Sequence, residues 1–151
     1  MKRILAIDPG PETSGVVVWD GTLVEAVQLD NPSLIYRLKE RSFGGAQVCA
    51  IEMIASYGMA VGREVFDTCV WIGRIIERAG IPAYLVYRKD VKIHLCGSMK
   101  AKDPNVRQAL IDKYGAPGTS KNRGKLYGVS GHLWAALAVA DYASTQDYAK
   151  P

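Results

Sequence analysis

Hydrophobic residues along much of the chain gather in short runs, each of which ends at a turn-forming residue. Such runs, rich in Val, Ile, Leu and Tyr, are typical of β-strands. The Asp20-Gly21 pair between the second and third runs is a favoured hairpin turn. We therefore predict strands over residues 2–8, 15–20, 23–29, 47–54 and 81–87.

The segments between and after these runs follow helical spacing or begin with helix-start signals. Asn31 followed by Pro32 predicts an N-cap and a first helical position. The last helix carries no charged residue from Leu133 to Ala140, which predicts burial on every side. Helices are expected near residues 31–41, 64–80, 89–95, 103–115 and 130–141.

The order of these elements, β-β-β-α-β-α-β-α, predicts an α/β fold. Hairpins come first, and later strands return to the sheet through helices. We expect a mixed five-stranded sheet flanked by helices, in the order of the ribonuclease H-like fold. The chain of 151 residues suits a single domain over 1–151 with a sizeable core.

The amino-acid composition indicates in which cellular environment the protein is expected. Hydrophobic residues make up 48% and charged residues 23%, as in soluble globular proteins. No signal-peptide pattern is found, and no apolar run approaches the roughly 20 residues that span a bilayer, so no membrane partner is expected. Three cysteines without close pairing predict free thiols and a cytoplasmic location.

Positive charge is concentrated in one stretch. Residues 88–125 hold ten basic and three acidic side chains, although the net charge of the whole chain is only +4. Such asymmetry predicts a surface that faces a polyanion, and ordinary solvated helix faces are an equally weighted alternative.

Two acidic residues lie inside apolar strands, Asp8 in the first and Glu52 in the fourth. A charged group there is costly unless it is paired or binds a metal. A single such residue is more often a structural hydrogen-bonding group, but two on neighbouring strands, about 4.8 Å apart, can share one divalent ion. Oxygen ligands favour Mg²⁺ or Mn²⁺. Gly10 and Gly15 leave the backbone near Asp8 open to a bulky substrate.

Three segments together resemble the RuvC family of Holliday-junction resolvases: IDPGPETSG (7–15), AIEMI (50–54) and HLWAALAVA (132–140). The segments 51–74 and 96–115 look most like RuvC-type members from bacteriophages. The resemblance covers nearly the whole chain. It implies a homodimer that cuts four-way DNA junctions with two divalent ions per active site, Mg²⁺ or Mn²⁺.

By position, Asp8 and Glu52 match the first two acidic residues of the family, and His132 matches the first ligand of its last helix. We therefore expect all three to be catalytic metal ligands; a capping or core-edge histidine is the alternative for His132. Many members have an aspartate three residues later, where this chain has Ala135. Either Ala135 is an inactivating substitution, or this subgroup builds its metal cluster differently. Asp141 would lie on the opposite helix face and cannot replace the missing ligand.

The resemblance also implies that the basic stretch over residues 88–125 binds DNA, with its side chains contacting the phosphates. After Glu52, Tyr57 and Met59 are expected to contact unstacked bases at the junction centre. Core packing is favoured for Phe66, and the helix over 64–79 is the expected dimer interface. The expected phosphate contacts are Arg88, Lys89, Lys92, Lys100, Lys102, Arg107, Lys121 and Arg123.

The predicted function is thus that of a crossover junction endodeoxyribonuclease, acting in recombination and repair of DNA in a bacterial host cell. Two alternatives stay open. One is a non-catalytic protein that binds branched DNA through a degenerate site, which Ala135 favours. The other is a nuclease that acts more broadly, on flaps, forks or RNA.

Overall fold

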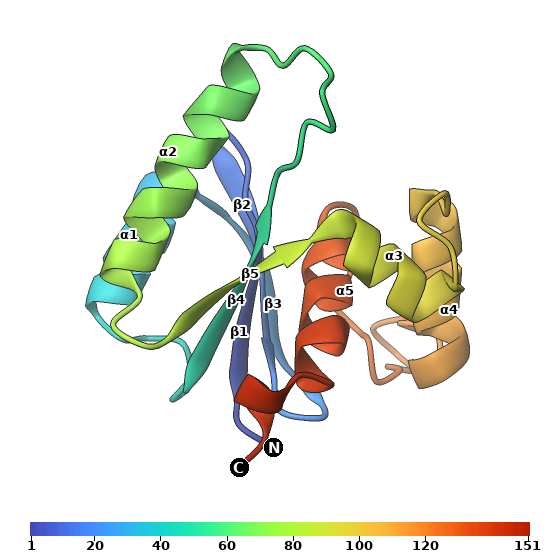
Figure 1. Ribbon diagram of the computed structural model, residues 1–151. Helices are drawn as coiled ribbons and strands as arrows, with labels where there is room; N and C mark the ends of the chain where they lie inside the picture. The colour runs from blue at the N-terminus through green and yellow to red at the C-terminus, as the bar shows by residue number, and fades with distance from the viewer.

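The computed structural model describes all 151 residues, arranged around one five-stranded sheet (Figure 1). The strand order is β3-β2-β1-β4-β5. The first three strands are antiparallel, and β4 and β5 run parallel to β1. The strands are β1 (Ile4–Asp8), β2 (Thr13–Trp19), β3 (Leu23–Asp30), β4 (Val48–Met53) and β5 (Ala83–Tyr87). This mixed sheet confirms the predicted fold class.

Helices cover both faces of the sheet (Figure 1). On one face lie α1 (Asn31–Lys39) and α2 (Arg63–Arg78). On the other face α5 (Leu133–Ser144) contacts β1 and β2 directly. Outside α5 pack α3 (Arg88–Cys96) and α4 (Asp103–Tyr114), and a short 3₁₀ helix, η1 (Asp147–Ala149), follows α5. None of the helices has the length and apolar character needed to cross a membrane.

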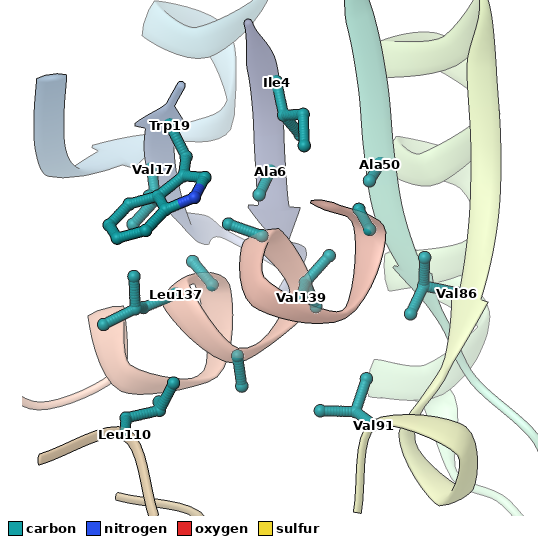
Figure 2. Close-up of a cluster of buried hydrophobic side chains, with 14 of the residues drawn as sticks. Ile4, Ala6, Val17, Trp19, Ala50, Val86, Val91, Leu110, Leu137 and Val139 are labelled. Atoms are coloured by element: carbon teal, nitrogen blue, oxygen red, sulfur yellow. The ribbon is translucent and has the colours of Figure 1, made fainter. Parts of the chain in front are cut away.

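The side chains of β1 alternate between two hydrophobic clusters. Ile4 and Ala6 face α5, whereas Leu5 and Ile7 face α1 and α2. Figure 2 shows Ala6 among the side chains that surround α5, together with residues of β2, β4, β5, α3 and α4. By the same alternation, Asp8 extends the α5-facing row of β1. The sheet therefore directs this acid toward α5.

Farther along α5, Asp141 is completely buried and fully hydrogen-bonded. It accepts hydrogen bonds from Lys113 Nζ at 2.8 Å and from the Tyr114 hydroxyl, and His94 Nε2 lies 2.9 Å from its other oxygen. These contacts tie α3 and α4 to α5. They also place Asp141 outside the cavity that receives Asp8, as its position on the helix predicted.

Two expectations about local structure were wrong. Asp30, rather than Asn31, caps α1, since its carboxylate accepts a hydrogen bond from the Ser33 backbone N–H at 2.8 Å. Phe66 is not a core residue: it is 62% exposed, because the buried face of α2 is formed by Thr68, Ile72 and Ile75 instead. The three cysteines are free, and only Cys49 is fully buried.

Candidate active site

The strand register brings Asp8 and Glu52 together. β1 and β4 are parallel and pair as far as Ile7 and Ile51, so Asp8 and Glu52 follow side by side on the same face of the sheet. Both line a cavity of about 310 Å³. Its walls come from strand ends and from the beginnings of α3, α4 and α5: Asp8, Glu52, Arg88, Val91, Lys92, Asp103, Val106, Gly131, His132, Trp134, Ala135, Ala138 and Val139.

The carboxyl group of Glu52 is in an unfavourable place for a negative charge. Burial is the main cause that raises its pKa well above the usual range, and the hydrogen bond to Asp8 and the charge of Asp8 raise it further. The positive charge of Arg88 acts in the opposite direction but does not cancel these effects. A cation bound beside Asp8 and Glu52 would stabilise the charged form of Glu52.

The turn after Asp8 is held by a buried hydrogen-bonded pair. The Ser14 hydroxyl donates to Asn31 Oδ1 at 2.6 Å, and Asn31 Nδ2 donates to the Gly10 carbonyl at 2.9 Å. A Cβ atom at Gly10 would lie 2.4 Å from the Thr13 carbonyl oxygen, so only glycine fits. The local pattern around Asn31 predicted only a helix cap, and nothing in it indicated that Asn31 braces this turn.

The start of α5 lies against β2 directly beside Asp8. Gly15 pairs with Asp8 across the β1–β2 hairpin. A Cβ atom at Gly15 would lie 3.3 Å from the His132 carbonyl oxygen, so the small residue permits the helix to approach. His132 and Ala135 consequently line the same cavity as the two acids. His132 is the N-cap residue of α5, but its side chain is exposed and makes no capping hydrogen bond.

These residues fit a first divalent ion better than a second. Asp8 and Glu52 offer neighbouring carboxylates of the kind that Mg²⁺ and Mn²⁺ prefer. However, no group of three or more His, Cys, Asp or Glu side chains is placed to hold a metal ion. His132 lies at the cavity but does not complete such a group, and Ala135 has no ligand atom. A second ion has no carboxylate of its own on α5.

The opposite wall of the cavity carries a charged pair that the sequence did not single out as a unit. Arg88 begins α3 and forms an ion pair with Asp103, the first residue of α4. Lys92, one turn after Arg88, lines the cavity too. Asp103 and Trp134 were not expected here; the Asp103-Pro104 pair predicts a helix start, but only the fold shows that this start faces the cavity.

The other expected phosphate contacts lie outside the cavity on α3, on α4 and in the loops that flank α4. All of them are exposed: Lys89, Lys100, Lys102, Arg107, Lys121 and Arg123. Lys121 and Arg123 belong to a tight turn in which Gly118 bridges to Arg123, and neither Gly118 nor Gly124 has room for a Cβ atom. Arg123 also lies over the Tyr127 ring, 4.6 Å from its centroid.

The loop between β4 and α2 extends from the end of β4 (Figure 1), which is the end that carries Glu52, and it bears two exposed apolar side chains. Tyr57 is 63% exposed and Met59 is 75% exposed. Phe66, in the first turns of α2, adds a third. Exposed apolar side chains of this kind are candidates for a binding surface.

Comparison with solved structures identifies the architecture. Thermus thermophilus RuvC superimposes with a TM-score of 0.67 and 18% identity, over 93% of this chain and 92% of that chain. Thermus thermophilus RuvC in complex with a Holliday junction substrate gives a TM-score of 0.72 and 19% identity, over 94% and 92%. The chain has a RuvC-like fold. No protein-family model and no curated protein matches the sequence.

Proposed function

We propose that this protein is a structure-selective endonuclease that resolves four-way DNA junctions by divalent-metal-dependent hydrolysis of phosphodiesters. The pair of adjacent carboxylates, Asp8 and Glu52, carries the proposal. They face each other in a cavity beneath the start of α5, within a RuvC-like fold. One of the similar structures contains a Holliday junction substrate.

Asp8 and Glu52 would hold the ion, Mg²⁺ or Mn²⁺. When bound, it would supply positive charge that activates water and stabilises the reacting phosphate. His132, which is exposed at the cavity, would either bind the ion or orient the attacking water through its imidazole ring. The turn braced by Asn31 keeps Asp8 in position for this task. The sequence resemblance favours two ions, but because Ala135 at the cavity offers no ligand atom, we propose a single ion held by the two acids.

DNA would be held mainly through its phosphates by the exposed basic side chains around α3 and α4. Tyr57 and Met59 would contact bases exposed at the junction centre, and their exposure suits that contact. Since a four-way junction has two-fold symmetry, we propose a homodimer. The exposed side of α2, which includes Val70 (61% exposed) and Arg74, is the proposed interface. A cytoplasmic role in DNA recombination and repair in a bacterial host, and a bacteriophage origin, are parts of the same proposal.

Ala135 favours a second candidate, a branched-DNA-binding protein without catalysis. Incubation with a four-way junction, a flap, a fork and a linear duplex of matched sequence, with Mg²⁺ and with chelator, separates the possibilities. We expect Mg²⁺-dependent cleavage of the junction above the other substrates. Tight binding without cleavage would favour the second candidate, and equal cleavage of flaps and forks would indicate a broader nuclease.

A further inference from the structure

Arg88 contributes a positive charge to the cavity, and the strand pairing before it positions its backbone. In β4 and β5, Glu52 pairs with Val86, and Arg88 follows two residues later, at the first position of α3. Val86 and Val91 are buried in the core cluster on either side of it in the chain. The backbone of Arg88 is thus fixed next to Glu52, while its side chain is half exposed and accessible to a ligand.

The hydrogen bonding of Arg88 leaves most of its donors free. Its ion pair with Asp103 uses one terminal nitrogen of the guanidinium group. An arginine has five N–H donors in a planar fork that suits phosphate oxygens. Asp103 can therefore hold Arg88 at the cavity while the remaining N–H groups bind a phosphate.

The charges of the cavity favour one divalent ion rather than two. The cavity is lined by three acidic side chains, Asp8, Glu52 and Asp103, and by two basic ones, Arg88 and Lys92, so its net charge is one negative when all five are ionised. One divalent ion would turn this into an excess of one positive charge, matching a single phosphodiester. A second ion would add two uncompensated charges beside Ala135, where no oxygen ligand is available.

From this arrangement we propose, on the basis of the proposed function, that Arg88 is a catalytic residue. It binds a non-bridging oxygen of the scissile phosphate and takes the place of a second metal ion, and Asp103 is its positioning residue.

The reaction balances with water as the only other reactant. The water oxygen bonds to phosphorus, and the P–O3′ bond breaks with its electron pair leaving on the 3′ oxygen. Water loses one proton and the 3′ oxygen gains one, which gives a 5′ phosphate and a 3′ hydroxyl. Negative charge grows on the non-bridging oxygens as the bonds change, and Arg88 would neutralise it at that moment.

The test compares Arg88→Ala and Arg88→Lys with Lys39→Ala, an exposed basic residue of α1 on the other side of the sheet. Single-turnover cleavage of a preformed junction complex should fall about a hundredfold or more in Arg88→Ala. Junction binding should weaken by less than about threefold, because many phosphate contacts remain. Guanidinium ion added at millimolar concentration should partly restore Arg88→Ala, and Arg88→Lys should retain partial activity. Lys39→Ala should behave as the unmodified protein.

A count of bound Mn²⁺ by electron paramagnetic resonance gives a readout independent of cleavage. We expect one ion per chain in the unmodified protein and in Arg88→Ala. Two tightly bound ions per chain would overturn the proposal, as would cleavage by Arg88→Ala within about twofold of normal, because charge neutralisation at the phosphate should be worth far more. If the unmodified protein cleaves no junction, the proposed function fails as well. Normal cleavage by Arg88→Ala refutes only the role of Arg88.

Discussion

Two acids near opposite ends of α5, Asp141 and Glu52, have opposite electrostatic environments. Asp141, near its C-terminal end, is completely buried, and hydrogen bonds from Lys113, Tyr114 and His94 outweigh burial and lower its pKa. Near the start of the helix, Glu52 faces another acid, and burial raises its pKa. An acid that only supports the fold has its partners within the chain. An acid that still needs a positive partner is a candidate for binding one from solution.

The largest difference between the two ends of α5 should be in catalysis, when Asp8→Asn is compared with Asp141→Asn. Asp8→Asn should abolish junction cleavage, because it removes a carboxylate from the proposed ion site. Binding should stay within about tenfold, or about 1.4 kcal/mol, since phosphate contacts supply most of the affinity. Asp141→Asn should keep most of its cleavage per folded molecule. Cleavage gels and binding titrations on the same preparations measure both, and normal cleavage by Asp8→Asn would remove the basis for the assignment.

For the free energy of unfolding the order should reverse, with a larger loss at Asp141 than at Glu52. Asp141→Asn should lower the free energy of unfolding by about 2 kcal/mol or more, because it disrupts a buried network of charged hydrogen bonds. The cost is limited because Lys113 can turn toward solvent. Glu52→Gln, measured in chelator, should be neutral or slightly stabilising, since it removes an unfavourable charge. Urea unfolding of both variants tests this, and a greater loss for Glu52→Gln would show that Glu52 is mainly structural.

Ala135→Asp should make the start of α5 more dependent on metal. The new carboxylate would join Asp8 and Glu52, so the variant should melt at a lower temperature in chelator and show a larger rise on adding Mg²⁺. It should also bind a second Mn²⁺ and cleave junctions faster. If neither the metal response nor the cleavage rate exceeds that of the unmodified chain, position 135 does not face the ion site.

The pH dependence of stability should differ in sign between the two acids. The pKa of Glu52 is raised by folding, so in chelator the folded state binds the extra proton, and stability should fall as pH rises above about 4.3 toward the raised pKa. The pKa of Asp141 is lowered, so its contribution should be lost as pH falls below about 3.9. Unfolding measured across pH, with Glu52→Gln as the control, should show the first slope disappear in that variant.

The hydrophobic pattern was enough to predict the sheet and to single out two acids within its strands. Asp8 and Glu52 interrupt apolar strands, and such interruptions are visible without a structure. The opposite wall was not predictable in this way, because the Arg88–Asp103 ion pair joins the starts of two different helices. The role of Asn31 was missed for a similar reason: its hydrogen bonds reach back to Gly10 and Ser14. Contacts between distant segments leave little trace in local sequence.

Cleavage of a supercoiled plasmid that extrudes a cruciform tests the central claim most directly, because the cruciform base is a four-way junction in otherwise intact DNA. With Mg²⁺, two matched nicks across the junction within one complex should convert this plasmid to the linear form, and a plasmid without the inverted repeat should stay supercoiled. Chelator should prevent the reaction. No cleavage with either Mg²⁺ or Mn²⁺, or equal nicking of both plasmids, would contradict the account.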